Sequence, residues 1–464
     1  EPHKNQNNKF SNNSIETNEG KLILDSHKLS YHYDRVQAWE NGERVAPISV
    51  DMALTRACGA MCSFCYAMVQ EPQERSTIKV KQALDLLDDF AEVGVKAVSL
   101  ISDGESTLSK AYVPFIEHAA NIGIDVGNAT NGWEWDPEKI DQVLPHLTWV
   151  RFTCAAGTPE GYSRIMFKDA THTEVFDRAM RNIKYAVELK KKLNLKVTLG
   201  IQMVLMPEFK DEIIPFAKLA VDLGVDYGVI KHCSDDEFGT LGVDYSKYED
   251  MYELLDQAES LGNETTKVIV KWDKIKDKGK PTYKRFYGPQ FLLQISGSGL
   301  VAPSGMFFNA RYSKLHIGNY VDEKFKDIFK SEKYWKIMDY LASPSFDAQT
   351  MMGTLPIQHY VSKALDDHIK GEKKITYGIG IGFPKEGVER YESDQTELAI
   401  GAGNGSNLTT ENLDKIRDYL NGGGFPDPLS NAEQLSFLFY FNMYEQVDAN
   451  NQLIDKKYKR IYSG

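Results

Sequence analysis

Three of the chain's five cysteines lie close together, at Cys58, Cys62 and Cys65. Thiolates on one short loop are soft metal ligands, and iron-sulfur clusters are a common occupant of such cysteine runs. Three ligands are one too few for a cubane held by four cysteines, so one iron would stay open to a substrate or cofactor, which suggests catalysis. A zinc site would need a fourth Cys or His at short spacing, and a disulfide would leave one thiol over.

The pattern Cys-x3-Cys-x2-Cys, with the aromatic Phe64 directly before the last cysteine, resembles the signature of the radical S-adenosylmethionine (SAM) enzymes. The resemblance implies that Cys58, Cys62 and Cys65 bind three irons of a [4Fe-4S] cluster and that SAM chelates the fourth. It also implies that reduction of the cluster cleaves SAM to a 5'-deoxyadenosyl radical, which abstracts hydrogen from a substrate.

The composition is that of a soluble globular protein, with 42% hydrophobic and 26% charged residues among 464. No apolar run of about 18 residues predicts a membrane span, and the polar start does not resemble a signal peptide. Free cysteines fit a reducing compartment, so we expect a cytoplasmic protein. The net charge of −12 argues against nucleic-acid binding. The Lys-rich stretch 267–280 is the best candidate for a local basic patch, and we interpret it instead as a solvated linker.

Six β-friendly segments alternate with segments of helical periodicity. We predict strands at 48–54, 97–101, 125–129, 149–154, 196–204 and 227–231, and helices at 76–93, 112–122, 137–144, 171–193 and 210–223. The 171–193 helix is expected to open with a capping box formed by Thr171 and Glu174. This alternation predicts an α/β fold with a parallel sheet. Six units are too few for a closed eight-stranded barrel, and the resemblance implies a partial (β/α)6 TIM-like barrel, whose chemistry gathers at the carboxyl ends of the strands.

The segment Ser102-Asp103-Gly104-Glu105 follows the second predicted strand and resembles the Gly-Gly-Glu motif of the family, with Asp103 in place of the first glycine. The resemblance implies that Asp103, Gly104 and Glu105 contact the SAM amino group. An ammonium needs acceptors, and a glycine lets the main chain come close. The alternative is that Glu105 only caps the next helix.

Four further positions at strand ends resemble SAM-contacting positions of the family. Asn131 would contact the ribose or the substrate, although Asn-Gly is also a common turn dipeptide. Thr153 would face the ribose or methionine part of SAM. Arg164 would bind the SAM carboxylate through its forked guanidinium, and Gln202 would touch SAM beside the adenine.

Three side chains are candidates for catalysis on the substrate. Cys154 is either a thiol hydrogen donor or a buried cysteine that acts as a small hydrophobe. Cys233 is a second candidate for quenching a product radical; the alternatives are a tyrosine, or a reaction that needs no such quench. His232, or its neighbour Lys231, is a candidate acid, base or substrate anchor, although a histidine at a strand end is more often structural.

The segment that starts at Phe291 resembles the SPASM and twitch extensions, which carry auxiliary clusters in some relatives. Ser304 stands where those relatives have a cysteine, so we expect an extension that holds no second cluster. A stretch at 355–369 faintly resembles one that carries a hydrogen-donating cysteine in epimerase-like relatives, and it has no cysteine. The predicted organisation is an N-terminal arm (1–45), the radical SAM partial barrel (46–270), an α+β SPASM-like extension without an auxiliary cluster (281–370) and a C-terminal cap (371–464).

The leading hypothesis is a radical SAM enzyme that uses a [4Fe-4S] cluster and SAM to abstract hydrogen from a peptide, in a modification such as epimerisation. A sugar or another small polar metabolite is the alternative substrate. The expected partner besides the substrate is a reducing electron donor of the flavodoxin or ferredoxin type. Two competing classes are a non-enzymatic iron-sulfur electron-transfer protein and a zinc-bound binding module.

Overall fold

The computed structural model describes residues 14–17, 20–23, 29–71, 73, 75–351 and 358–375. The chain divides into two units, one made of residues 1–43 and 375–464 and the other of residues 44–374. In the first unit, β1 (Ser14–Thr17) pairs antiparallel with β2 (Gly20–Ile23), and η1 (Leu29–His32) leads into α1 (Tyr33–Glu40). Nearly all of the predicted C-terminal cap, and residues 352–357 of the predicted extension, lie outside the described residues.

The second unit is built on one curved sheet with the strand order β12-β11-β10-β3-β4-β5-β6-β7-β8-β9. The eight adjacent strands from β10 to β9 run parallel to one another. Beyond β10, the strands β11 and β12 extend the sheet with antiparallel pairing. The strands are β3 (Ser49–Met52), β4 (Ala97–Leu100), β5 (Asp125–Thr130), β6 (Trp149–Thr153), β7 (Thr198–Leu205), β8 (Tyr227–His232), β9 (Lys267–Val270), β10 (Leu292–Ile295), β11 (Leu300–Ala302) and β12 (Gly318–Asn319).

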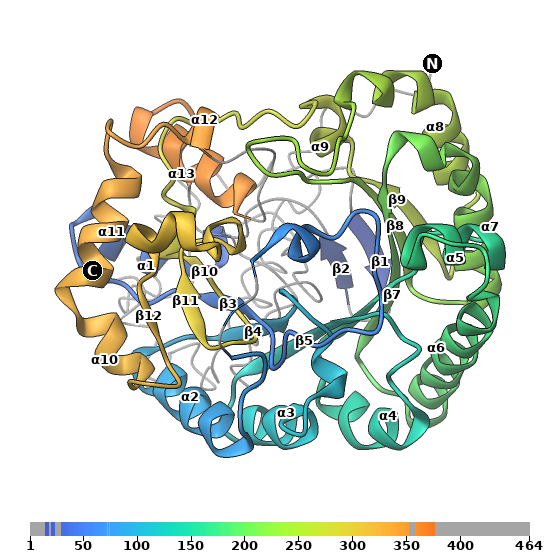
Figure 1. The fold of residues 1–464 in the computed structure, drawn as a ribbon, viewed down its shortest axis with the longest axis horizontal. Helices are drawn as coiled ribbons and strands as arrows, with labels where there is room; N and C mark the ends of the chain where they lie inside the picture. Colours follow the sequence, from blue (N-terminus) through green and yellow to red (C-terminus); the bar gives the residue numbers. More distant parts are fainter. Residues whose placement is uncertain are drawn as a thin grey trace, which may run out of the picture. The chain divides into compact units, whose positions relative to one another are not determined.

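Helices cover the outer side of this sheet (Figure 1). The helices of this unit are α2 (Val80–Val93), α3 (Tyr112–Asn121), α4 (Pro137–Val143), α5 (Pro159–Phe167), α6 (Thr173–Leu193), α7 (Ile213–Leu223), α8 (Tyr252–Ser260), α9 (Trp272–Lys276), α10 (Phe325–Lys330), α11 (Glu332–Ala342), α12 (Ala348–Met351) and α13 (His359–Lys370). Short 3-10 turns matter for the site: η5 (Pro207–Glu212), η6 (Tyr245–Met251), η8 (Gly305–Phe307) and η9 (Ala310–Leu315). None of these described helices has the length and hydrophobicity needed to cross a membrane.

All six predicted strands are present and parallel, which confirms the α/β class with a partial TIM-like sheet. The structure adds two parallel strands. The stretch interpreted as a solvated linker contains β9 and α9. That interpretation is wrong for residues 267–276 because Val268 to Val270 are buried in β9 and Lys274 and Ile275 are buried in α9. β10 belongs to the predicted extension, yet it pairs in parallel with β3 and so joins the extension directly to the barrel sheet.

The predicted capping box of α6 is wrong. The helix begins at Thr173, and its N-cap residue His172 makes no side-chain capping bond. Asp169 organises this turn instead: its carboxylate accepts a hydrogen bond from the Thr171 main-chain N–H at 3.0 Å and lies 2.9 Å from Nδ1 of His172. Thr171 is therefore part of the turn before the helix and not its cap.

Side chains alternate between the two faces of each parallel strand. A Cβ on Gly228 of β8 would lie 2.7 Å from Ala220 of α7, so this position faces the helices. The neighbouring Tyr227 faces the opposite side, where its ring fills the space beside Gly200 of β7: a Cβ there would lie 2.2 Å from the ring. The helix-facing side forms the main hydrophobic core, and the opposite side is the inner face of the curved sheet.

The strand register assigns the functional candidates to these two faces. Several polar positions share the inner face with Tyr227, namely Asp51, Ser99, Arg151, Thr153, Gln202 and Lys231. His232 instead shares the helix-facing side with Gly228, and its ring packs edge-to-face against Tyr245 and Tyr248 of η6. The inner face therefore carries most of the polar candidates, and the helix-facing side contributes mainly apolar side chains to the core.

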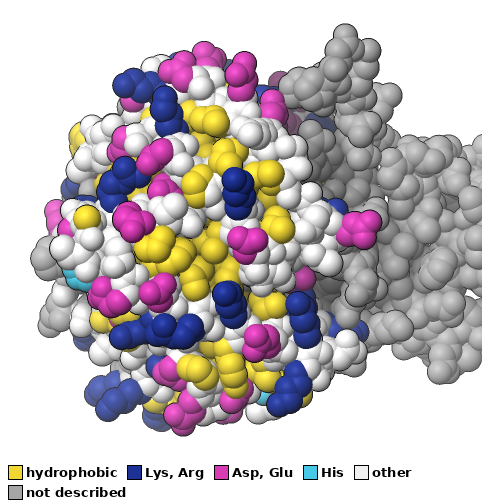
Figure 2. Space-filling view, turned by 90° about the vertical axis from the view of Figure 1, so that its right-hand side faces the viewer, with side chains coloured by type: hydrophobic (Ala, Val, Ile, Leu, Met, Phe, Trp, Pro, Cys, Tyr) yellow, Lys and Arg dark blue, Asp and Glu magenta, His cyan; other side chains and the backbone are white. Residues whose placement is uncertain are grey.

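The outer surface seen in Figure 2 mixes acidic and basic side chains with hydrophobic ones. Neither sign of charge forms a continuous area on this face. Binding to a nucleic-acid backbone usually needs a basic stripe or patch, so this face does not present that feature.

Candidate active site at the carboxyl ends of the strands

The cysteine loop leaves the carboxyl end of β3, and its first residues are tightly held. The Arg56 main-chain N–H donates to the carbonyl of Ser76 at 2.6 Å, and the Thr55 hydroxyl donates to the same carbonyl at 2.9 Å. Cys58 is exposed, and Cys62 and Cys65 are half-buried. Three thiols thus lie on one loop at the edge of the sheet where catalytic βα loops gather.

Two other loops enclose the cysteine loop. Trp133, which follows β5, packs directly on Gly59: a Cβ on this glycine would lie only 2.3 Å from Cη2 of the indole. On the other side, the main-chain N–H groups of Met61 and Ser63 donate to carbonyls at the end of α5, both at 2.9 Å. The position of the thiols therefore depends on β5 and α5 as well as on β3.

The electrostatics of the loop disfavour three free thiolates. Burial, followed by the neighbouring Cys65 and Cys58 groups, raises the pKa of Cys62 well above its ordinary value. Cysteine must be deprotonated to bind a metal, so a bound cation would offset the free energy needed to form the thiolates. Among the described residues, no three His, Cys, Asp or Glu side chains converge around a single metal ion. In a cluster each cysteine binds its own iron, so the thiols need to surround the cluster and not to meet at one point.

Asp103, at the first position of the Gly-Gly-Glu-like segment, is fully engaged by the chain. Its carboxylate accepts hydrogen bonds from Arg56 Nε at 3.0 Å, Ser296 Oγ at 2.6 Å and the Gly297 N–H at 2.8 Å. The residue is 1% exposed. Its side chain therefore holds the turn between β10 and β11, and its predicted contact with SAM stays a prediction.

Glu105 is likewise saturated by donors from the chain. One carboxylate oxygen accepts hydrogen bonds from the Thr107 N–H, the Thr107 hydroxyl and the Thr130 hydroxyl, and the other accepts from the Asn131 N–H at 2.7 Å. Burial raises the pKa of Glu105 to about 7 despite these donors. The side chain ties the end of β4 to the end of β5, so a ligand beside this segment meets mainly its backbone.

Gly104 brings that backbone close to the cysteine loop. A Cβ at this position would lie 2.0 Å from the carbonyl oxygen of Thr55, and the Glu105 N–H donates to the carbonyl of Ala57 at 2.9 Å. Only a glycine permits such an approach. The predicted segment and the cysteine loop are therefore direct neighbours.

Asn131 forms a turn with Glu134. Its amide Nδ2 donates to Glu134 Oε2 at 2.6 Å, and its Oδ1 accepts from the Glu134 N–H at 3.2 Å. This arrangement matches the turn interpretation of the Asn-Gly dipeptide. Its predicted contact with ribose or substrate remains a prediction.

Thr153 and Gln202 lie side by side in register on the inner face. Gln202 is 5% exposed, and its Oε1 is buried without a hydrogen-bond partner in the described part of the chain. Buried acceptors are nearly always paired in proteins, so this oxygen calls for a donor from a ligand or water. These two positions fit a polar cofactor on the inner face.

Arg164 lies further from the inner face. Its Nη2 donates to Asp211 Oδ2 at 2.7 Å, and its guanidinium stacks 5.3 Å from the ring centroid of Phe209 in η5. The side chain is 45% exposed. Its predicted binding of the SAM carboxylate, still a prediction, would require Asp211 to release it.

The three predicted catalytic side chains are buried. The Cys154 thiol donates to the carbonyl of Ala156 at 3.4 Å. The Cys233 thiol lies 3.7 Å from the carbonyl oxygen of Phe64, next to the last cluster cysteine. His232 donates from Nδ1 to the carbonyl of Cys233 at 2.7 Å, and burial, with the nearby Lys274, lowers its pKa to about 3. Cys233 therefore contacts the cysteine loop.

Three further residues of this site were not expected from the sequence. Trp133 and Glu134 enclose Gly59, and Arg56 pairs with Asp103. Their partners are distant in the sequence, so no local spacing indicates these contacts. The Trp-Glu pair directly after the Asn-Gly turn, at a strand end, was the only available signal.

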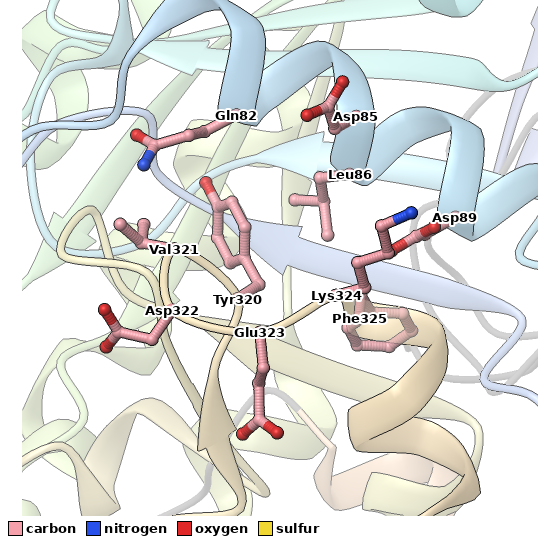
Figure 3. Close-up of a pocket in the computed structure, with 10 residues that line it drawn as sticks. All are labelled: Gln82, Asp85, Leu86, Asp89, Tyr320, Val321, Asp322, Glu323, Lys324 and Phe325. Atoms are coloured by element: carbon pink, nitrogen blue, oxygen red, sulfur yellow. The ribbon is translucent and has the colours of Figure 1, made fainter.

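The pocket shown in Figure 3 is separate from the cysteine loop. It has a volume of about 180 Å³ and lies between α2 and the segment from Tyr320 to Phe325. Three of its carboxylates are paired with cations: Asp322 with Arg75, Asp85 with Lys81 and Asp89 with Lys326. No cysteine lines it, so it is not the candidate active site.

Comparisons with known proteins place the site in a family. The sequence model of the Radical SAM superfamily matches residues 52–220. The sporulation killing factor maturation protein SkfB of Bacillus subtilis is 32% identical over 101 residues, which are 22% of this chain and 24% of SkfB, so the match spans about a quarter of that protein. A probable GTP 3',8-cyclase of Saccharolobus islandicus is 23% identical over 297 residues, 62% of this chain and 85% of the cyclase.

Solved structures with a similar fold include SuiB of Streptococcus suis. Its complex with S-adenosylmethionine has a TM-score of 0.51 at 13% identity, covering 66% of this chain and 71% of SuiB. Its complex with the precursor peptide SuiA has a TM-score of 0.51 at 14% identity, covering 74% and 77%. Radical SAM domains use a [4Fe-4S] cluster and SAM, and the cysteine loop and the unpaired Gln202 acceptor fit both. Residues 52–220 match the Radical SAM superfamily, so this part of the chain is a radical SAM domain.

Proposed function

We propose that this radical SAM enzyme binds its [4Fe-4S] cluster through Cys58, Cys62 and Cys65 and modifies a peptide. The observation that carries the proposal is the position of the three thiols on one loop at the carboxyl end of β3. When bound, the cluster and SAM supply a radical that abstracts hydrogen from the substrate. The chain supplies the positions of these groups.

Each part of the site has a positioning task in this proposal. Trp133 and the end of α5 hold the cysteine loop in place. The backbone at Gly104 lies beside the loop, and in this proposal the segment contacts the SAM amino group. Gln202 and Thr153 offer polar atoms on the inner face for the nucleoside part.

Among the predicted catalytic side chains, we favour Cys233 over Cys154 and His232 for delivering hydrogen to a substrate radical. Its thiol lies against the carbonyl of Phe64, beside Cys65. Both thiols also donate to a carbonyl of their own segment, Cys154 to Ala156 and Cys233 to Ser234, so the approach to Phe64 is what distinguishes Cys233. His232 faces the helices. Cys233 is fully buried, so this role needs a local opening of the segment after β8.

Two findings support a peptide substrate. The relative SkfB is a maturation protein for the sporulation killing factor, and SuiB, which shares the fold, has been captured with a precursor peptide. The SkfB match spans a short part of both chains, so the peptide substrate is our inference. A flavodoxin or ferredoxin type of electron donor is part of the same proposal.

A small polar metabolite is the second candidate substrate. The GTP 3',8-cyclase match covers most of the length of that enzyme. The inner face also carries cations, Arg151 and Lys231, that suit a negatively charged ligand. This candidate predicts a response to a nucleotide and none to peptides.

The test is a deuterium-transfer experiment with anaerobically assembled full-length enzyme, SAM and dithionite. One reaction receives a deuterated peptide digest, and the other receives deuterated GTP. Deuterium in 5'-deoxyadenosine from the peptide reaction supports peptide modification, and deuterium from GTP supports the metabolite candidate. The Cys62→Ala variant is the control and should form no 5'-deoxyadenosine with either probe. Formation of 5'-deoxyadenosine by that variant would overturn the cluster assignment.

A further inference from the structure

The main chain just before the cysteine loop is closely packed on two sides. A Cβ on Gly104, after β4, would lie 2.0 Å from the Thr55 carbonyl oxygen. A Cβ on Gly297, in the turn between β10 and β11, would lie 2.3 Å from the Thr55 carbonyl carbon. The barrel and the C-terminal hairpin therefore touch the same peptide unit, three residues before Cys58.

Asp103 joins the two sides chemically. It follows β4, it accepts from Arg56 in the stem of the cysteine loop, and it accepts from Ser296 and Gly297 in the hairpin turn. Asp103 is 1% exposed and Ser296 is fully buried. Hydrogen bonds to a buried charge are stronger than neutral ones, and a charge left without its partner in such a place is costly.

Asp103 occupies the position at which the family's Gly-Gly-Glu motif has a glycine. A glycine there could make none of these side-chain contacts. The substitution thus adds a link between the motif and the C-terminal hairpin, at the edge where the hairpin strand β10 pairs with β3.

We propose that Asp103 is a positioning residue that locks the β10–β11 hairpin onto the stem of the cysteine loop and balances the charge of Arg56 beside the cluster. The inference rests on the proposed cluster site. It makes the C-terminal extension part of that site without any auxiliary cluster. It also predicts that the residues of the clamp affect the cluster although none of them is a ligand.

Charge separates this role from a purely structural one. Reduction adds an electron to the cluster, and its potential depends on nearby net charge. Asp103→Asn removes a negative charge and leaves Arg56 uncompensated, so the midpoint potential should rise. Arg56→Gln removes the positive charge, so the potential should fall. The double variant should return close to the wild-type potential.

The contact itself is tested by hydrogen exchange on the full-length protein without cofactors. The Gly297 amide donates to Asp103. In Asp103→Gly, hydrogen exchange at this amide should be about tenfold faster or more, because losing one hydrogen bond to a charged group changes the opening equilibrium by about that factor. Ser296→Ala removes only the hairpin hydroxyl and should give a smaller increase. This variant keeps the test valid if Asp103→Gly fails to fold.

Asp226→Asn is the matched control. Asp226 also accepts from a cation, Lys190, and from a main-chain N–H, that of Leu199, but it precedes β8 at the opposite end of the sheet. It should leave the potential and the Gly297 exchange unchanged. Unchanged exchange in Asp103→Gly, or shifts of the same sign in Asp103→Asn and Arg56→Gln, would overturn the proposal. A wild-type protein that binds no iron would overturn the proposed function instead, and exchange at Gly297 would still decide whether the clamp exists.

Discussion

Replacing Glu105 with glutamine should remove a pH dependence from the stability of the protein. The side chain is buried and tied to the ends of β4 and β5 by hydrogen bonds from Thr107, Thr130 and Asn131. Burial outweighs these donors and raises its pKa from 4.5 to about 7. The folded protein therefore keeps a proton on Glu105 in a pH range where the unfolded chain has released it.

The sign and size of the effect follow from linkage. A raised pKa in the folded state contributes stability that is fully present below pH 4.5 and is lost as the pH rises through about 7. Each pH unit between the two pKa values corresponds to about 1.4 kcal/mol. The free energy of unfolding should therefore fall by about 3 kcal/mol across this interval because of Glu105 alone.

Glutamine cannot titrate, so the variant lacks this fall. Glutamine also has an NH₂ group in place of one carboxylate oxygen, so at least one donor loses its acceptor. This loss lowers the free energy of unfolding by about 1–3 kcal/mol at every pH. Subtracting the variant's free energy of unfolding from that of the wild type should thus give a difference that shrinks by about 2.5 kcal/mol on going from pH 5 to pH 8.

Urea unfolding of the cluster-free full-length protein at several pH values between 5 and 8 measures this difference. Glu117→Gln, on the exposed side of α3, is the control and should keep the wild-type pH dependence. A difference between wild type and Glu105→Gln that stays constant, or that grows with pH, would refute the assignment of a raised pKa to this carboxylate.

Three other substitutions test the packing around the site. Gly59→Ala should lower the iron retained after anaerobic assembly several-fold, because its Cβ would lie 2.3 Å from Trp133, whereas Ala60→Gly in the same loop should retain iron; equal retention would contradict the packing. Cys154→Ala should cleave SAM within about twofold of the wild-type rate, since a buried cysteine behaves as a small hydrophobe; a loss of activity at normal iron content would instead make it catalytic. Glu212→Gln should lower the free energy of unfolding by about 1–3 kcal/mol in urea titrations, because this carboxylate accepts three hydrogen bonds at the start of α5; an unchanged value would remove it from that role.

The barrel strands could be predicted because their signals are local. Apolar β-friendly runs and helical periodicity lie within each segment, and all six predicted strands were found. β10 was missed as a barrel strand because its partner β3 lies more than two hundred residues earlier, and pairing between distant segments leaves no pattern in either. β9 was missed because the flanking lysines dominate its composition, although its central residues are buried.

The candidate site divides in the same way. The cysteines, Gly104 and Glu105 stand at recognisable spacings, and the structure brings them together beside the end of β3. The contacts of the Asp103 and Glu105 side chains were not predictable, because the groups that donate to them lie at the end of β5 and in the β10–β11 hairpin. The sequence indicates which residues gather at the carboxyl ends of the strands. Only the tertiary contacts decide which of these side chains can still bind a ligand.

We propose above all that the three thiols of the β3 loop hold a cluster that cleaves SAM. The most direct measurement is 5'-deoxyadenosine formed by anaerobically assembled protein with SAM and dithionite, with iron and electron paramagnetic resonance measured on the same sample. We predict one [4Fe-4S] cluster per chain, a spectrum that changes when SAM is added, and 5'-deoxyadenosine that is absent in Cys58→Ala, Cys62→Ala and Cys65→Ala. Wild-type protein without iron, or cysteine variants that form 5'-deoxyadenosine at the wild-type rate, would contradict this claim.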